Sequence, residues 1–513
     1  MKRELRSLTE ADREKFLDAA AALWQYSDEE GRALFGDGFT SAATFVEEHA
    51  LASNDMMCDQ FHEGSGFLTH HLAITNSFEA SLRAVNPTVT LPYWDFTIEG
   101  QQIVDEGESP SYFLEISPFL SDTWFGSVDE FDHIADSRFS GSTAPKVSNS
   151  SVVAPNSYGY IRSYWNNNND ERVVRHLFDV CGVEATHKTV PACKAHWEVL
   201  NTASLGDFLL LSPSDGHGPL HVQLGGIGGD CIDAYKAFGD RWSYILDANI
   251  TESEILDAGY DLDSWNWGMV APRRAMVERY IYGEYFHIYR SLWRSHMCAR
   301  DQTPQLLVCP ESCSADTPMA DCACGVPALT NGTTDWENVF DCFLAVPSQQ
   351  LFRSVMPDEL LSDLVTTISS SPIMEGEMVE SASPSDILFW VIHPTIERLL
   401  SAKRLSTVSS MGSEEFVKWN SSDGSEEEWL SYSYYSLEAG ENAYFPDEYT
   451  CTGHAADDPV LPDRLGYISG FVELADTNSD RYISNLEYFL AMNPNSADGM
   501  DYVFDHFEWT HCD

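Results

Sequence analysis

Positive charge is scarce in this sequence. Its 513 residues include 29 Lys and Arg against 81 Asp and Glu, which gives a formal net charge of −52. A chain this acidic repels the phosphates of nucleic acids and the headgroups of anionic membranes, so we expect no nucleic-acid partner. The charge favours high solubility, divalent counter-ions, or a salty medium that screens the self-repulsion.

Long apolar segments are also missing. No run approaches the roughly 18 residues that are needed to cross a bilayer, so we expect no membrane span. Met1, Lys2, Arg3 and Glu4 lead into charged residues and not into an apolar signal sequence. We expect one of three explanations: a signal was removed, translation starts further upstream, or the protein is intracellular.

Cysteine, by contrast, is plentiful. There are 12 cysteines, and seven of them fall between Cys231 and Cys342. The spacing Cys309-x-x-x-Cys313 permits a zinc site, but nearby glycosylation sequons favour disulfides. An oxidising compartment is therefore expected, with the protein secreted or in the lumen of the secretory pathway as a glycoprotein. The sequons begin at Asn149, Asn249, Asn331 and Asn420.

Helical periodicity dominates the rest of the chain and predicts a mainly α fold. Thr9 and Ser41 are suited to cap the first and second of these helices. The apolar spacing predicts helices over 9–26, 41–52, 68–85, 273–296 and 387–400, with shorter candidates at 172–180 and 195–203.

Histidines recur in an ordered pattern. His62 and His71 lie nine residues apart, and His217 and His221 lie four apart, so one side of a helix can present the latter pair. His393 lies in the strongly apolar helix over 387–400. Each of these histidines alone is more commonly an ordinary core or surface residue. Together, the ordered set indicates a metal centre, and imidazole suits copper.

The pattern resembles the type-3 copper family of tyrosinases, catechol oxidases and mollusc-type haemocyanins. The resemblance covers about 1–95, 205–230 and 380–435. The matching positions are His49, His62, Phe67, His71, Phe78-Glu79, Leu82 and Pro92 to Asp95 in the first half, and His217, His221, Gly225-Gly226, Ser383-Pro384, Asp386, Phe389, His393 and Glu397-Arg398 in the second.

The resemblance implies a mainly α fold in which a four-helix bundle holds two copper ions. It implies an enzyme that oxidises o-diphenols to o-quinones with dioxygen, and in some members also hydroxylates monophenols. Two alternatives stay open: oxygen binding as in haemocyanin, and a secreted structural protein with a degraded copper site. The implied ligands are His49, His62 and His71 for one copper ion and His217, His221 and His393 for the other.

The sequence departs from the family pattern at three positions. Leu72 replaces an Arg after the third histidine, Gly218 replaces an Asn after the fourth, and Ile392 replaces a His before the sixth. In tyrosinases that Asn, with an upstream carboxylate, helps to orient a water that takes the phenol proton. Asp207 is our candidate for the catalytic carboxylate. The loss of the Asn makes monophenol hydroxylation less expected than diphenol oxidation.

Several neighbours of the histidines have competing interpretations. His70 competes with His71 as the third ligand, and the register of Phe78-Glu79 favours His71. Cys58 is either half of a disulfide or a partner in a thioether with a histidine. Three carboxylates are expected either to orient imidazole rings or to cap helices: Asp95, Asp386 and Glu397.

We expect two domains. The first is a tyrosinase-like dicopper domain over 1–435, with an insertion at 231–380 whose Cys-rich part is 298–342. The second is an acidic, EF-hand-like domain over 455–513, in which Arg481 replaces the Gly expected at the sixth loop position. The alternative is an acidic capping helix that binds no ion. The predicted calcium ligands are Asp476, Asn478, Asp480, Tyr482 through its carbonyl, Ser484 and Glu487.

Overall fold

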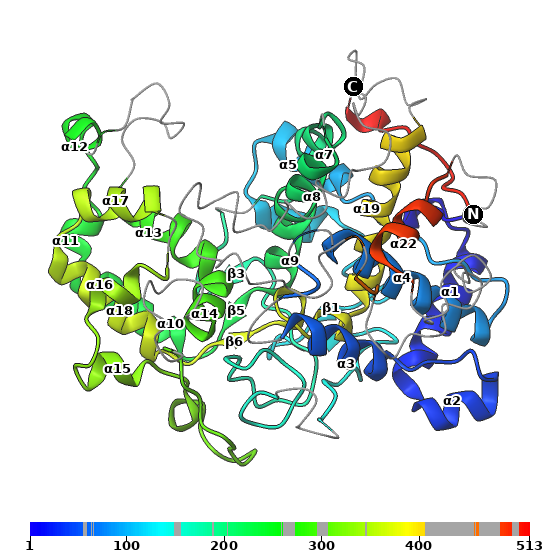
Figure 1. Cartoon of the computed structure of the whole chain (residues 1–513), viewed down its shortest axis with the longest axis horizontal. Helices are drawn as coiled ribbons and strands as arrows, with labels where there is room; N and C mark the ends of the chain where they lie inside the picture. Colours follow the sequence, from blue (N-terminus) through cyan, green and yellow to red (C-terminus); the bar gives the residue numbers. More distant parts are fainter. Residues whose placement is uncertain are drawn as a thin grey trace.

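A computed structural model gives the fold (Figure 1). It describes residues 1–54, 59–62, 64, 66–147, 155–186, 189–202, 204–257, 259, 272–294, 306–343, 346–405, 456, 458–460, 483–494 and 502–512.

One group of helices carries the predicted histidines. The hydroxyl of Thr9 caps the first of them and that of Ser41 caps the third, by accepting backbone N–H groups of the first turn. This group consists of α1 (Glu10–Gln25), α2 (Asp28–Phe35), α3 (Ala42–Ser53), α4 (Gly66–Val85), α5 (Thr97–Glu106), α6 (Phe113–Ile116), α7 (Cys193–Leu200), α8 (Leu205–Ser214), α9 (Gly218–Gly225), α19 (Ile387–Leu405) and α22 (Asn485–Ala491).

A second group of helices gathers on the left in Figure 1, beside the first. It falls within the predicted insertion at 231–380. Its members are α10 (Cys231–Arg241), α11 (Ser243–Leu246), α12 (Glu252–Asp257), α13 (Arg273–Tyr280), α14 (Tyr285–Trp293), α15 (Pro327–Thr330), α16 (Trp336–Phe340), α17 (Val346–Val355) and α18 (Asp358–Ser370).

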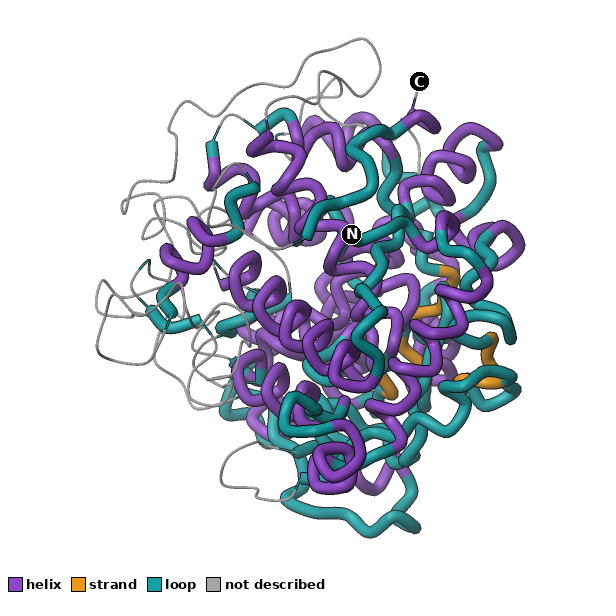
Figure 2. The backbone as a smooth tube through the Cα atoms, turned by 90° about the vertical axis from the view of Figure 1, so that its right-hand side faces the viewer, coloured by secondary structure: helices purple, strands orange, loops and turns teal. Residues whose placement is uncertain are grey.

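Short strands lie on one side of the helical bulk (Figure 2). One hairpin pairs β1 (Ser127–Val128) with β2 (Ile134–Ala135). A four-stranded sheet has the order β4-β3-β5-β6, in which β3 and β5 are parallel and the other neighbours are antiparallel. Its strands are β3 (Asp179–Val180), β4 (Val183–Glu184), β5 (Ile227–Gly228) and β6 (Met374–Glu375).

Two large apolar cores match the two helix groups. The first core packs residues of α1, α3, α4, α9 and α19, and Phe78 stacks on Trp390 at its centre with ring centroids 3.8 Å apart. The second core is built mainly from residues between Ile227 and Ile373. The histidine-bearing helices therefore pack around one apolar core, and the second helix group packs around another.

The C-terminal residues pack against the first core. Tyr488 and Phe489 of α22 belong to that core, and a disulfide joins Cys512 to Cys193 at the start of α7. Other disulfides join Cys181 to Cys231, Cys309 to Cys324 and Cys313 to Cys322. The disulfide interpretation of the 309–324 cysteines is therefore confirmed, and the zinc alternative is not supported.

The mainly helical fold class is confirmed. The predicted helix over 172–180 is wrong, because Asp179 and Val180 form β3 and Val174 pairs with His133 in an isolated bridge. No helix in the described ranges is both long and apolar enough to cross a membrane. The regular four-helix bundle, the EF-hand and the two domain boundaries stay predictions.

Candidate metal centre

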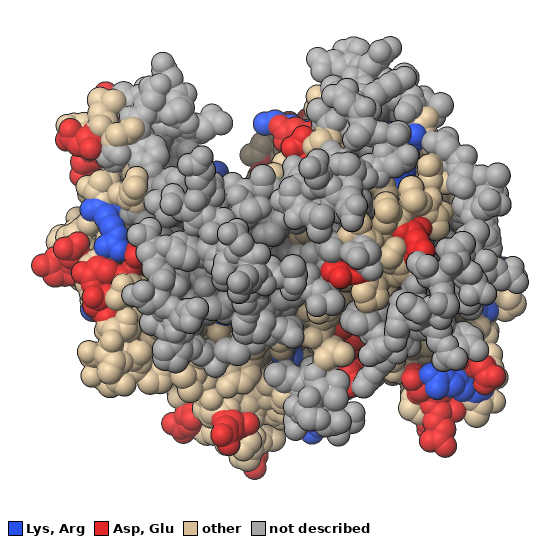
Figure 3. All heavy atoms as spheres, viewed as in Figure 1, with Lys and Arg blue, Asp and Glu red and all other residues tan. Residues whose placement is uncertain are grey.

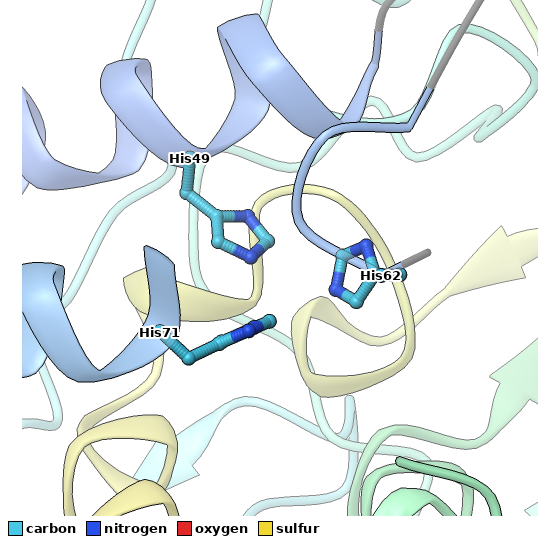
Figure 4. A group of neighbouring side chains, drawn as sticks. All are labelled: His49, His62 and His71. Carbon is cyan, nitrogen blue, oxygen red and sulfur yellow. The ribbon is translucent and has the colours of Figure 1, made fainter. Parts of the chain in front are cut away.

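Three histidines converge from two helices and the loop between them (Figure 4). His49 lies on α3, His71 on α4, and His62 on the connecting loop. One ring nitrogen of each lies within 4.8 Å of the others. His49 and His71 are buried, whereas the side chain of His62 is 31% exposed. We call these residues the first trio.

A second trio forms in the same way from His217, His221 and His393, again with ring nitrogens within 4.8 Å of one another. His217 directly precedes α9, whose first turn contains a proline, and His221 follows one turn later. His393 lies on α19. His217 and His393 are buried and His221 is partly exposed, so each trio has one member that reaches toward solvent.

The two trios face each other. His71 of the first trio stacks on His393 of the second, with ring centroids 4.5 Å apart and planes 6° from parallel. Phe67 contacts both His71 and His217, each at a centroid distance of 5.0 Å. Phe389 lies 4.0 Å from His393 and 5.3 Å from His49 between ring centroids. Apolar rings therefore wall the space between the trios.

All six histidines use the same ring nitrogen for a hydrogen bond to the protein. Five Nδ1 atoms face backbone carbonyls, and that of His62 faces the Asp59 carboxylate. An oxygen acceptor at Nδ1 fixes the proton there and leaves Nε2 with a free lone pair. The Nδ1 to oxygen distances are 2.7 Å from His49 to Ser381, 3.0 Å from His62 to Asp59, 2.7 Å from His71 to Phe67, 2.9 Å from His217 to Ser212, 2.6 Å from His221 to Met378 and 2.7 Å from His393 to Phe389.

The Nε2 atoms of His49, His71 and His393 are buried and have no hydrogen-bond partner among the described residues. Buried polar atoms without a partner are uncommon, and these three nitrogens are suited to bind a metal ion. Burial lowers the pKa of His49 to about 3 and that of His221 to about 4. Burial also lowers the pKa of His217 well below its usual value, and neighbouring imidazoles add to the effect. The rings of His49, His217 and His221 are therefore neutral at pH 7 and can bind a cation without losing a proton.

Asp59 contacts the ring of His62, and the sequence analysis did not predict this contact. Its carboxylate is 1% exposed and accepts hydrogen bonds from the backbone N–H of Phe61 and of His62, as well as facing the His62 ring. Burial alone would raise the pKa of Asp59, but His62 and the guanidinium groups of Arg294 and Arg290 hold it well below its usual range. The signal available in the sequence was its position three residues before His62 in an Asp-x-x-His spacing.

The carboxylates expected to orient the rings stabilise the scaffold instead. Asp386 pairs with Arg175 and accepts the backbone N–H of Leu388 at the start of α19, so its capping interpretation holds. Asp95 pairs with Arg398 at 2.9 Å, and Glu397 pairs with Lys2 at 2.8 Å. In the two trios, only the Nδ1 of His62 faces a carboxylate, and the other five Nδ1 atoms face main-chain carbonyls. A main-chain carbonyl has no signature in the sequence.

Asp207 lies away from this arrangement. It is exposed in the first turn of α8, where its backbone N–H and its carboxylate both bond to the hydroxyl of Ser204. This position gives no support to the proton-accepting role. At Gly218, an added Cβ would come within 2.4 Å of the Pro213 carbonyl, so the backbone here excludes the Asn of the family pattern. The competing His70 is buried but outside both trios.

The calcium prediction falls mostly outside the described residues, because Asp476, Asn478, Asp480 and Tyr482 are not among them. Ser484 and Glu487 form a capping box at the start of α22. Calcium binding is not supported by this contact and stays a prediction. Cys58 also lies outside the described residues.

Known proteins match parts of this chain. The family model for the common central domain of tyrosinase matches residues 39–240, a range that ends before His393. Grixazone synthase of Streptomyces griseus is 42% identical over 65 residues, which are 13% of this chain and 17% of that enzyme. The chain thus matches less than a fifth of that relative's length. Residues 39–240 are therefore similar to the common central domain of tyrosinase, and they include five of the six histidines of the two trios.

Proposed function

We propose that this protein is a copper-dependent oxidase that converts o-diphenols to o-quinones. Two molecules of diphenol and one of dioxygen yield two molecules of quinone and two of water. The observation that carries the proposal is the pair of facing trios. Each Nδ1 in them bonds to the protein, and the buried Nε2 atoms of His49, His71 and His393 have no hydrogen-bond partner among the described residues.

The residues present fit two copper ions. The imidazoles form two groups of three, and imidazole nitrogen is a preferred ligand of copper, which heads the affinity order of the divalent metals. Each trio would supply three nitrogen ligands to one ion. We assign His49, His62 and His71 to one ion and His217, His221 and His393 to the other. When bound, the copper pair supplies the electron transfer from diphenol to dioxygen.

The chain positions both the ligands and the substrate. Main-chain carbonyls and Asp59 hold the rings, and the apolar rings of Phe67 and Phe389 line the space between the trios. We propose that a planar phenol enters past the partly exposed His62 and His221. An aromatic ring is suited to stack against imidazoles in an apolar cavity.

Several residues favour diphenols over monophenols. Gly218 carries no side chain that can orient a water, and the close approach of the Pro213 carbonyl keeps one out. Asp207 points to Ser204 at the exposed end of α8. An o-diphenol loses its first proton more readily than a lone phenol and is more easily oxidised, so we infer that it needs no dedicated base.

The cellular setting follows from the cysteines. The disulfides join distant parts of the chain, such as Cys193 to Cys512, and such bonds persist in oxidising compartments. The described sequon residues Asn249 and Asn331 are both exposed, as glycosylation requires. We therefore propose secretion or residence in the secretory pathway. The predicted calcium loop is proposed as a structural element of the same secreted protein.

The experiment is oxygen consumption by the copper-loaded protein with a catechol and, separately, with a monophenol. We expect catechol turnover at half a mole of oxygen per mole of quinone, and little or no turnover of the monophenol. Reversible oxygen binding without turnover would identify a carrier instead. Failure to take up copper would identify a degraded site, and either result would reject the proposal.

A further inference from the structure

His62 is held differently from its neighbours. It lies on a loop, whereas His49 and His71 lie on helices (Figure 4). It is the partly exposed member of the first trio. Its Nδ1 faces a carboxylate, with 3.0 Å and 3.2 Å to the two oxygens of Asp59, whereas the other Nδ1 atoms face main-chain carbonyls. Its orientation therefore depends on where the Asp59 side chain is held.

Asp59 is held by the second helix group. Its Oδ2 lies 3.5 Å from Nη1 of Arg290 and 3.6 Å from Nη1 of Arg294. Arg290 is on α14 and Arg294 directly follows it. Both side chains are almost fully buried, with 6% and 1% exposure. Nη2 of Arg294 also donates to the carbonyl of Ser53, the last residue of α3, at 2.8 Å.

These arginines lie outside residues 39–240, the range that matches the tyrosinase central domain. In Figure 1, α14 belongs to the second helix group, on the left, and lies on the side of that group nearer the histidine-bearing helices. One buried contact thus joins the predicted insertion to a loop ligand and to the end of the helix that carries His49.

We propose that Asp59, Arg290 and Arg294 form a clamp through which the predicted insertion positions His62 and so sets the copper affinity of the first trio. The three are positioning residues, because they act through His62. A carboxylate on Nδ1–H fixes the ring and makes Nε2 a stronger donor, and loss of such a partner typically lowers metal affinity about 10–100-fold. The two guanidinium groups lie within 3.6 Å of the buried carboxylate and hold it in place. This inference rests on the proposed dicopper function.

The test compares Asp59→Asn and Arg294→Met with the matched control Arg274→Met. Arg274 is a partly exposed residue of α13 that pairs with Asp247, so its loss removes one guanidinium from the same helix group without touching the clamp. Copper affinity is measured by competition with a chelator, and uncoupled Cu(II) by electron paramagnetic resonance. The second trio serves as an internal control for folding.

We expect Asp59→Asn to lower the affinity for one of its two copper ions by about 10–100-fold. At limiting copper, the Asp59→Asn protein should then hold one copper ion per chain. Its electron paramagnetic resonance spectrum should match that of a His71→Ala variant, which lacks a ligand of the first trio, and not that of a His217→Ala variant, which lacks a ligand of the second. Arg294→Met should lower the affinity for the same copper ion by a smaller factor. Arg294→Lys should bind this ion more tightly than Arg294→Met does, and Arg274→Met should bind both ions with wild-type affinity.

The proposal is overturned if the clamp variants keep both ions at wild-type affinity. It is also overturned if they lose both ions in parallel or fail to fold while Arg274→Met folds, because the residues would then act on the whole fold. If the wild-type protein takes up no copper, the proposed function fails, and this result is distinct from the others.

Discussion

The segment between β6 and α19 touches both trios, and its anchor is a clear target for perturbation. The carbonyl of Met378 accepts a hydrogen bond from His221 of the second trio, and the carbonyl of Ser381 accepts one from His49 of the first. A shift of this short segment would therefore turn one ring in each trio. We predict that loosening its anchor weakens the binding of both copper ions.

The anchor is a buried ion pair between Arg162 and Glu377, both 0% exposed. Nε of Arg162 donates to Glu377 at 2.8 Å, and the backbone N–H of Val174 donates to the second carboxylate oxygen at 2.6 Å. Glu377→Gln keeps the size and an acceptor oxygen but leaves the guanidinium without its counter-charge. Breaking such a pair costs about 3–5 kcal/mol. Backbone carbonyls also accept from Arg162, so we expect about 3 kcal/mol, at the lower end.

Urea unfolding of the metal-free protein measures the first effect, and chelator competition measures the second. Glu377→Gln should lose about 3 kcal/mol of unfolding free energy and bind both copper ions more weakly. Arg241→Met breaks the partly exposed pair with Asp363 and should cost less than about 1 kcal/mol. A Glu377→Gln protein within about 1 kcal/mol of the wild type and with unchanged copper affinity would refute the reasoning.

Three further predictions follow from the same structure. His217→Ala should bind one copper ion per chain instead of two and should lose catechol oxidation, and unchanged copper content would contradict the ligand assignment. Burial raises the pKa of Glu380 to about 7, so between pH 4.5 and 7 the folded state holds a proton that the unfolded state releases, and wild-type stability falls with rising pH. Relative to Glu380→Gln, the free energy of unfolding of the wild type should fall by up to about 3 kcal/mol between pH 5 and pH 8. A difference in unfolding free energy that does not change with pH would argue against the raised pKa of Glu380. Finally, the net charge of −52 should make the thermal midpoint rise from about 0.01 M to about 1 M salt, as the screening length falls from about 30 Å to about 3 Å, and a constant midpoint would show that self-repulsion is unimportant.

The helices that carry ligands were predictable because their signals are local. The expected helix over 41–52 corresponds to α3, and that over 387–400 to the first part of α19. Ser41 caps as predicted, and the apolar periodicity was strong in both segments. The helix over 172–180 failed because its apolar residues are buried by long-range pairing, and Val180 aligns with Ile227 in a sheet that no local pattern reveals.

The histidines of both trios were identified from spacing and family resemblance, and the structure brings them together in the predicted groups. What holds the rings was not predictable in the same way. Main-chain carbonyls such as those of Met378 and Ser381 carry no side-chain signature. The two arginine partners of Asp59 lie more than 200 residues away in sequence, and their approach depends on how the second helix group docks. Tertiary contacts of this kind are set by packing and not by local pattern.

Anomalous diffraction at the copper edge from crystals of the copper-loaded protein tests the central claim most directly. We predict two peaks, one bonded to Nε2 of His49, His62 and His71 and the other to Nε2 of His217, His221 and His393. A single peak, the absence of both, or copper bonded through Nδ1 would contradict the dicopper assignment.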